Sequence, residues 1–467
     1  MSHLLISAAH KSSGKTTVSI GLCAALTSTG KIVQPFKKGP DYIDPLWLAR
    51  ATGRACHNLD FYTMDRDEIK SVFVRNSAGS DLQLIEGNKG LYDGLDLDGS
   101  NSNAALAKLL KTPVVLVIDA RGMTRGIAPL ILGYQAFDTD IHIAGVILNQ
   151  VGGLRHESKL RNVIEHYTDA KVLGAVQRDE RLNIDERHLG LMPSNEFQQV
   201  SEKIGLLSDA VKQQVDLDQL IQLATQAEAV TEDNVIEIQQ QTKVTDIRIG
   251  IVKNEAFGFY YPGDLQAFEA CGAELVEIDT ITDEQLPEID GLFIGGGFPE
   301  TLLTELESNQ TMQQSIKDAI DNGLPTYAEC GGLMYLCRNI CWQGKTAKMV
   351  GVIPANSIMN EKPQGRGYVR LQVTDAFNWP IDAQEREQVV SAHEFHYSSL
   401  EGLPKDSDFA FDVIRGVGIS GKKDGYIYKN LMACYSHMRD SRQNHWVSRF
   451  VQFVSDCKQQ LNKERMK

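Results

Sequence analysis

One cysteine in this sequence occupies a position where a thiol could act as a nucleophile. In GLPTYAECGGLMYL, Cys330 follows an expected strand at 326–328 and precedes a helix that starts near Gly332. A nucleophile at such a sharp strand-to-helix turn exposes its sulfur, and backbone N–H groups and the helix dipole stabilise both thiolate and oxyanion. Because most cysteines are simply small buried residues, this setting distinguishes Cys330 from the rest of the eight cysteines.

A nucleophilic thiol needs a base, and three histidines are candidates. His437 lies in the strand-like stretch MACYSHMR near the end of the same α/β block, and we predict that it is the base. His393 and His396 compete for that role. Gly296 and Gly297 follow another expected strand and could supply oxyanion N–H groups, although an ordinary tight turn would use the same glycines.

A second chemical signal lies near the start of the chain. The stretch AHKSSGKTT joins an expected strand at 3–8 to the helical VSIGLCAALTSTG, which is the setting of a P-loop. There, backbone N–H groups cradle phosphates, a lysine reaches the β- and γ-phosphates, and a hydroxyl binds Mg²⁺. The residues assigned to the nucleotide are Ser13, Gly14, Lys15, Thr16 and Thr17. Ala9 replaces the first glycine of the motif, and a plain capped helix is the alternative.

Carboxylates follow in two further loops. FKKGPDYIDP places Asp41 and Asp44 in a Gly/Pro-rich loop, and LIEGNKGLYDG places Glu86 after a buried strand, with Asp93 in the next turn. Carboxylates at strand ends are well placed to hold Mg²⁺ between protein and phosphate oxygens. Any one of these acids could equally cap a helix or stabilise a turn. The predicted metal ligands are Thr16, Asp41 and Glu86.

Alternating strands and helices must position these residues. Short apolar runs at 3–8, 82–85, 114–118 and 143–148 are typical of buried parallel strands, and longer helical stretches separate them. From residue 247, IRIGIV is a strand, DLQAFEACG a helix, and DGLFIGGGFPE a strand that runs into a glycine turn. The pattern predicts an α/β fold with two doubly wound domains. The predicted bounds are 1–200 and 247–455, joined by a helical, Gln-rich connection at 201–246.

Composition and charge argue against some classes of binding partner. Lys+Arg 47 against Asp+Glu 61 gives a net charge of -14, which repels a polyanion, so we do not expect nucleic acid as a partner. The apolar run at 113–118 is far shorter than the ~20 residues of a membrane helix, and the N-terminus does not read as a signal peptide. Without a CxxC pair, the cysteines suggest free thiols in a reducing compartment. We therefore expect a cytoplasmic protein without a membrane partner.

Several stretches, in order, resemble the cobyrinic acid a,c-diamide synthase family over nearly the whole chain. They are SSGKTT, KGPDYIDP, EGNKGLYDG, GVILNQVGG, GGGFPE, YAECGGLMYL, HEFHYS and YSH. The resemblance implies an N-terminal P-loop domain similar to dethiobiotin synthetase and a C-terminal domain similar to class I (triad) glutamine amidotransferases. It also implies that Cys330 forms a thioester, that His437 activates it, and that Asn149 contacts the nucleotide. Where many class I enzymes carry a glutamate, two residues beyond His437, this chain has Arg439, as in a two-residue version of the site.

The resemblance implies a ligase that forms C–N bonds. ATP, with Mg²⁺, phosphorylates a substrate carboxylate, and ammonia released from L-glutamine attacks the acyl phosphate. The substrate implied is a tetrapyrrole polycarboxylate, amidated on its a and c acetate side chains. The acceptor or acyl-phosphate region would contain Lys38, Asp44 and Asp93. The roles of HEFHYS and of GRGYVRL, which contains Tyr368, stay open, and so does a homodimer.

Other functions remain alternatives at this point. Nickel-sirohydrochlorin a,c-diamide synthases and the sirohaem amide synthase associated with dissimilatory sulfite reductase act on similar side chains. The stretch KKGPDYIDPLWLA, with Trp47 after the Asp-Pro, looks unlike the version in cobyrinate enzymes and keeps the sirohaem enzyme as a rival. A partition-type switch ATPase would share the P-loop and the sheet. It would not need Cys330, and its signature lysine, five residues before Lys15, is His10 here.

Overall fold

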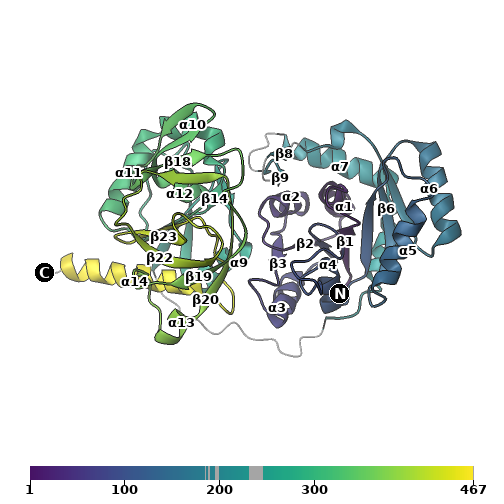
Figure 1. Cartoon of the computed structure of the whole chain (residues 1–467), viewed down its shortest axis with the longest axis horizontal. Helices are drawn as coiled ribbons and strands as arrows, with labels where there is room; N and C mark the ends of the chain where they lie inside the picture. Colours follow the sequence, from purple (N-terminus) through teal and green to yellow (C-terminus); the bar gives the residue numbers. More distant parts are fainter. Residues whose placement is uncertain (185, 188–189, 195–198, 231–245, 466–467) are drawn as a thin grey trace. The chain divides into compact units, whose positions relative to one another are not determined.

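The computed structural model consists of two compact α/β units, Met1–Ile236 and Glu237–Lys467 (Figure 1). Their boundary falls outside the described part of the chain. The residues described are 1–184, 186–187, 190–194, 199–230 and 246–465. The predicted connection at 201–246 begins, in its described part, with helices α7 (Val200–Gln214) and α8 (Leu217–Ala224). Helix α7 packs on α1 (Lys15–Ser28), so part of the predicted connection packs against the first unit. The predicted bounds of the domains stay a prediction.

The first unit contains a sheet of seven parallel strands in the order β3-β2-β4-β1-β5-β6-β7. The strands are β1 His3–Ala8, β2 Val33–Lys38, β3 His57–Leu59, β4 Leu82–Glu86, β5 Val114–Asp119, β6 Ile143–Val151 and β7 Val172–Gln177. The four strands predicted at 3–8, 82–85, 114–118 and 143–148 are confirmed as β1, β4, β5 and β6. They are buried almost throughout, which explains their continuous apolar sequences.

Helices cover both faces of this sheet (Figure 1). Helix α1 contacts α2 and α7, whereas α3 contacts α4 and α5 contacts α6. The remaining elements of the unit are α2 Ile43–Thr52, α3 Arg66–Ser77, α4 Asn103–Leu110, α5 Ile127–Phe137, α6 Leu154–Tyr167, the 3₁₀ helix η1 Glu180–Leu182, β8 Glu186–Arg187 and β9 Gly190–Leu191. Because all seven strands are parallel, the loops that follow β1, β2, β4 and β6 lie along one edge of the sheet, where ligands bind in such folds.

The second unit contains a nine-stranded sheet in the order β12-β10-β13-β15-β24-β23-β22-β19-β20. The parallel half comprises β12 Ala273–Ile278, β10 Ile247–Val252, β13 Gly291–Ile294, β15 Thr326–Glu329 and β24 Leu431–Cys434. The antiparallel half comprises β23 Lys423–Tyr428, β22 Asp408–Arg415, β19 Gly365–Val373 and β20 Val389–His396. The sequence predicted only the parallel half. Strands such as β19 alternate buried and exposed residues, the pattern of an antiparallel sheet.

Strand β20, at the far edge of this sheet, returns to the chain that follows β24. An antiparallel bridge joins His393 of β20 to His437, with hydrogen bonds in both directions. Two small sheets complete the unit, β11-β14 and β17-β16-β18-β21. Their strands are β11 Phe257–Phe259, β14 Gly296–Gly297, β16 Cys337–Trp342, β17 Lys345–Lys348, β18 Ile353–Met359 and β21 Ser398–Glu401.

The helices of the second unit are α9 Pro262–Ala270, η2 Pro299–Leu302, α10 Leu303–Ser308, α11 Gln310–Asp321, α12 Gly331–Leu336, α13 Ala383–Glu387 and α14 Trp446–Arg465. Aromatic side chains pack α14 and α9 against the sheet, with Trp446 in contact with Phe268 and Phe293. Of the helices in the described ranges, none is long and apolar enough to cross a membrane.

Candidate active sites

The P-loop lies between β1 and α1, as the sequence predicted. Gly14, the N-cap of α1, has a φ of 78°, and a Cβ there would lie 2.1 Å from Nδ2 of Asn149. Asn149, near the end of β6, donates from Nδ2 to the carbonyl of Ser13 at 2.9 Å and so holds the loop. Among the described residues, no side chain caps the first turn of α1. The positive end of this helix is therefore oriented as an anion site requires.

Two lysines and two carboxylates meet beside the P-loop. Lys15 pairs with Glu86, and Lys37 pairs with Asp44 and also lies 3.1 Å from Glu86. The Thr16 hydroxyl donates to Glu86 Oε1 at 2.6 Å and lies 3.1 Å from Asp44 Oδ2. The ends of β2 and β4 and the starts of α1 and α2 thus bring their polar side chains together.

This cluster has the chemistry of a magnesium site. Oxygen atoms of Thr16, Asp44 and Glu86 lie close together, and Mg²⁺ prefers oxygen ligands. Glu86 Oε2 is buried and has no hydrogen-bond partner among the described residues, which suits a cation. Within the described ranges, no three His, Cys, Asp or Glu side chains are grouped to hold a metal.

The other predicted acids have structural contacts. Asp41 Oδ1 accepts hydrogen bonds from the N–H groups of Ile43 and Asp44, which caps α2, while its Oδ2 lies 3.8 Å from Lys37. Asp93 is exposed and accepts from the N–H of Gly90 at 2.8 Å, which closes a turn. Asp44 thus accepts from the Thr16 hydroxyl, whereas the predicted ligand Asp41 accepts from backbone N–H groups, and the ligand set stays a prediction.

The adjacent lysines Lys37 and Lys38 differ in charge environment. Burial opposes the charge of Lys37, but Asp44 and Glu86 outweigh burial and raise the pKa of its ammonium. Burial lowers the pKa of Lys38 to about 8, helped by Lys89 and opposed by Asp60. The Lys38 ammonium donates to Asn88 Oδ1 at 3.3 Å. Lys38 is therefore a buried cation whose hydrogen-bond acceptor is a neutral amide.

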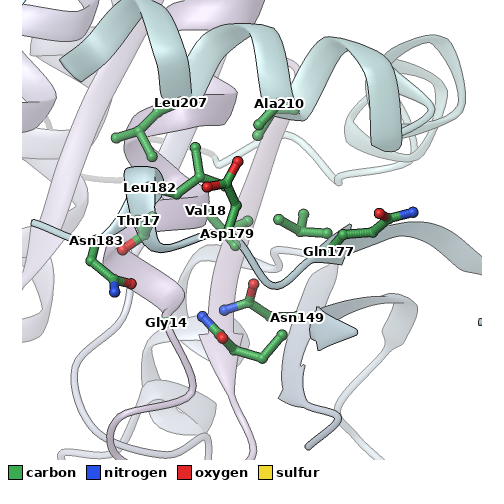
Figure 2. Close-up of a pocket in the computed structure, with 13 residues that line it drawn as sticks. Gly14, Thr17, Val18, Asn149, Gln177, Asp179, Leu182, Asn183, Leu207 and Ala210 are labelled. Atoms are coloured by element: carbon green, nitrogen blue, oxygen red, sulfur yellow. The ribbon is translucent and has the colours of Figure 1, made fainter. Parts of the chain in front are cut away.

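A pocket of about 430 Å³, part of it open to solvent, adjoins the P-loop (Figure 2). Val18, Leu182 and Leu207 supply apolar walls, and polar side chains of β6 and of the β7–η1 segment face the same space. Its lining residues are Gly14, Thr17, Val18, Asn149, Gln150, Val176, Gln177, Asp179, Leu182, Asn183, Leu207, Ala210 and Val211. Apolar walls with a few polar groups are typical of small-molecule pockets.

In the second unit, Cys330 forms the predicted turn between β15 and α12. Its φ of 48° and ψ of -100° lie outside the regions that side chains favour, as is common at a nucleophile elbow. Cys330 is 7% exposed, less than the sequence led us to expect. The reason is that β20 passes over the thiol, whose sulfur lies 4.0 Å from the carbonyl oxygen of Phe395.

His437 lies beside the thiol, three residues beyond the end of β24. Its imidazole makes hydrogen bonds with Cys330 and Glu329. Burial disfavours a charged ring, but these two partners outweigh burial and raise the pKa of His437 to about 10. At neutral pH the pair therefore favours an imidazolium next to the sulfur, the arrangement that activates a cysteine.

The two competing histidines have different surroundings. The His393 ring stacks on His437 at 4.9 Å, and its Nδ1 lies 3.3 Å from the hydroxyl of Tyr261. Burial, together with the charges of His437 and Arg439, lowers the pKa of His393 well below its usual value. His396 points to the opposite face of β20, where it stacks on Tyr435 at 3.8 Å.

Gly296 and Gly297, which were predicted to form the oxyanion hole, lie beside His437 and Gly331. A Cβ at Gly296 would lie 2.7 Å from Cε1 of His437, and a Cβ at Gly331 would lie 2.9 Å from the nitrogen of Gly297. Neither Gly296, beside His437, nor Gly331, beside Gly297, thus leaves room for a side chain. The direction of their N–H groups toward an oxyanion stays a prediction.

Two models of known protein families match this chain, one in each unit. Residues 5–191 match the CobQ/CobB/MinD/ParA nucleotide binding domain, and residues 248–444 match the CobB/CobQ-like glutamine amidotransferase domain. The cobyrinate a,c-diamide synthase of Magnetococcus marinus is 42% identical over 96% of both chains. That of Methanosarcina acetivorans is 40% identical over 93% of this chain and 92% of its own.

This chain belongs to the cobyrinate a,c-diamide synthase family.

Membership in the cobyrinate a,c-diamide synthase family confirms the predicted α/β fold class, with a P-loop unit and a glutamine amidotransferase unit. It also supports the predicted ligase over a partition-type switch ATPase, since the amidotransferase domain spans the second unit.

The structure brings to these sites some residues that the sequence did not single out. Glu329, which immediately precedes the nucleophile, contacts His437 at 3.2 Å, although the two are 108 residues apart. Gln177, Asp179 and Asn183 line the pocket beside the P-loop. The one available signal for Glu329 was a carboxylate next to the nucleophile at the end of a buried strand, whereas the three pocket residues belong to an ordinary polar loop.

Proposed function

We propose that the chain is an ATP- and glutamine-dependent ligase that converts the a and c acetate carboxylates of a cobyrinate-type tetrapyrrole into amides. The observation that carries this proposal is the presence in one chain of a P-loop with its lysine and carboxylate cluster and of a cysteine elbow with its histidine. The name of the relatives supports the cobyrinate substrate over the sirohaem and nickel-sirohydrochlorin alternatives. Trp47, which kept the sirohaem enzyme as a rival, is fully buried and donates from its indole N–H to the carbonyl of Met192, so it packs inside the fold.

In the synthetase reaction, ATP transfers its terminal phosphoryl group to an acceptor carboxylate, and ammonia then displaces phosphate from the acyl carbon. Lys15 and the N-terminus of α1 hold the phosphates of ATP. Oxygens of Thr16, Asp44 and Glu86 would hold magnesium, which supplies positive charge against the phosphates. The pocket beside Gly14 and Asn149 suits the nucleoside, because it adjoins the P-loop and combines apolar walls with amide groups.

Lys38 is our candidate for holding the acceptor. It is buried at the end of β2, next to the strand that ends at Glu86, and its acceptor Asn88 is neutral. Burial makes an ammonium group costly when its hydrogen-bond acceptor is neutral. An incoming carboxylate or acyl phosphate would therefore bind favourably to Lys38, because it supplies the opposite charge.

In the glutaminase reaction, the Cys330 thiolate attacks the side-chain amide carbon of glutamine. His437 gives its proton to the departing ammonia, and water then hydrolyses the thioester to release glutamate. Backbone N–H groups near Gly296 and Gly297 would stabilise the oxyanion. The eight free cysteines suit a reducing compartment such as the cytoplasm.

Mass spectrometry of products tests this function. The full-length protein is incubated with ATP, magnesium and glutamine and with cobyrinate, nickel-sirohydrochlorin or sirohaem in turn, and amide groups are counted from the mass change. We expect two amidations of cobyrinate, dependent on ATP. Preferential amidation of sirohaem would replace the substrate assignment, and amide formation without ATP would contradict the ligase mechanism.

A further inference from the structure

The side chain of Glu329 is enclosed beside the catalytic pair. It ends β15, directly before Cys330, and is 2% exposed. Its Oε2 lies 3.2 Å from Nδ1 of His437, and its Oε1 accepts from the N–H of Met438 at 2.9 Å and from the hydroxyl of Tyr327 at 2.7 Å. The carboxylate is thus fixed on one side and directed at the imidazole on the other.

The backbone at Cys330 explains how two consecutive residues reach one histidine. In a regular strand, successive side chains point to opposite faces. The positive φ of 48° at Cys330 ends that alternation, so the thiol turns toward the ring that Glu329 already contacts. His437 makes hydrogen bonds with both residues. The elbow therefore aligns carboxylate, imidazole and sulfur.

We propose that Glu329 is the acid that orients His437 for glutamine hydrolysis. Its carboxylate accepts the Nδ1–H of His437, which leaves Nε2 for exchange of a proton with the Cys330 thiol, and its charge stabilises the imidazolium. This is the function of the third member of a catalytic triad, performed here from the position before the nucleophile. The inference rests on the proposed glutaminase function, and it makes Glu329 a positioning residue.

The other groups around the imidazole do not supply this charge. Arg439, at the position where class I enzymes often carry an acid, is cationic and lies over the Tyr261 ring at 4.9 Å. The stacked His393 has a pKa held well below its usual value by burial and by two neighbouring cations, so it is neutral at physiological pH. Glu329 is the carboxylate that pairs with the imidazole of His437, at 3.2 Å.

A purely structural role for Glu329 is the competing explanation, because its contacts with Met438 and Tyr327 also tie β15 to the chain after β24. Loss of a structural tie would lower stability without changing how the thiol titrates. Loss of the orienting acid would change the pH dependence of the thiol in a folded protein. The two roles are therefore separable by experiment.

Glu329→Gln in the full-length protein tests the proposal. Glutamine keeps acceptors for Met438 and Tyr327, but its amide cannot accept the Nδ1–H if its NH₂ group faces the ring. We expect glutamate release to fall by roughly 10²–10⁴-fold, the range for losing acid–base catalysis, while amidation with ammonium salts persists. Glu394→Gln is the matched control, since Glu394 is equally buried in the same unit but accepts from Val417 and Gly418.

Alkylation of Cys330 by iodoacetamide across pH provides the deciding readout. In Glu329→Gln, as in His437→Asn, the rise of alkylation rate should move to higher pH, and Glu394→Gln should match the wild type. Unchanged glutamate release and alkylation in folded Glu329→Gln would overturn the proposal. If Cys330→Ala still hydrolysed glutamine, the proposed function itself would be wrong.

Tyr327→Phe keeps the test decisive if Glu329→Gln does not fold. This variant removes one donor to Oε1 but keeps the carboxylate and its bond to His437. The orienting role predicts a fall in glutamate release of only a few fold, with the alkylation profile retained. If glutamate release fell as far in folded Tyr327→Phe as in His437→Asn, the contact of Glu329 with Tyr327, rather than its contact with His437, would be the one that glutamine hydrolysis requires.

Discussion

In the P-loop unit, buried charged side chains contact several partners. Around Cys330, by contrast, the contacts follow one path, from Glu329 to His437 and from His437 to the thiol. Glu86 contacts Lys15, Lys37 and Thr16 at once, and Lys37 also pairs with Asp44. If phosphates and magnesium bind here as proposed, each lysine can pair with a phosphate and leave its carboxylate to the metal. The groups around Cys330 are preorganised instead, since Glu329 already contacts His437 and His437 already contacts Cys330.

The two strand-to-helix turns differ in the same way. Gly14 adopts a φ of 78° without strain, and it approaches Asn149 too closely for any side chain. Cys330 adopts a φ of 48° although it must carry its thiol. A phosphate loop can thus use glycine at its turn, whereas a nucleophile elbow stores local strain.

Lys15→Ala should have the largest effect and should separate the two sites. We expect ATP-dependent amidation to fall roughly 10³-fold or more with either glutamine or ammonium, because one preorganised charge against the phosphates is lost. Glu86 keeps Lys37 as a partner in this variant, so the fold should persist. Cys330→Ala should instead lose only the glutamine-dependent reaction.

The assay for this comparison is amide formation with each nitrogen source. Lys31→Ala, at an exposed lysine just after α1, is the control and should behave as wild type. Normal amidation by Lys15→Ala would show that the loop is merely structural.

Residues of the two sites differ in how well the sequence could predict them. Lys15, Thr16, Glu86 and Cys330 follow or precede buried strands, so local pattern located them. The partnership of Glu329 with His437 depends on a backbone torsion and on pairing across 108 residues, which no local pattern contains. The antiparallel half of the second sheet was missed because its half-exposed strands lack continuous apolar runs.

Asp41 and Asp44 show a distinction that the sequence left open. The position of Asp41 in the Gly/Pro-rich loop suggested a metal ligand, but in the fold its Oδ1 caps α2, and burial next to Asp44 raises its pKa to about 6. Asp44, one helical turn further, meets Thr16 instead. Sequence identified the loop, whereas packing decided which carboxylate faces the hydroxyl.

Lys38→Met should have an intermediate effect, confined to the synthetase site. Lysine is charged below its pKa, so a pKa of about 8 predicts that acceptor binding is strongest below pH 8 and weakens as pH rises through it. In the variant, the KM for the tetrapyrrole should rise about 10-fold or more, the value of one charged hydrogen bond, and should lose this pH dependence.

Lys38→Arg is the matched variant, because arginine stays charged and should keep KM low above pH 8. Glutamate release measured without the acceptor should be the same in both variants and the wild type. A KM that is independent of pH in the wild type would contradict the assignment of Lys38 to the acceptor.

Cys330→Gly should have the smallest effect, on stability, and it sharpens the comparison of the two turns. At φ 48° and ψ -100°, a side chain costs about 1–3 kcal/mol of strain, which glycine relieves. Glycine also gains freedom in the unfolded chain, which costs about 0.5–1 kcal/mol. Relative to Cys330→Ala, which also lacks the thiol but keeps a Cβ, we expect Cys330→Gly to be more stable by about 0.5–2 kcal/mol.

Urea unfolding followed by tryptophan fluorescence measures this difference, because Trp342, Trp379 and Trp446 lie in the same unit as the elbow and only Trp47 lies in the other. Both variants should fail to use glutamine and should keep amidation with ammonium, so function provides no confounding difference. A Cys330→Gly protein less stable than Cys330→Ala would mean that the elbow is unstrained. Like the turn at Gly14, the turn at Cys330 would then have a positive φ without strain, and the nucleophile elbow would store no strain energy.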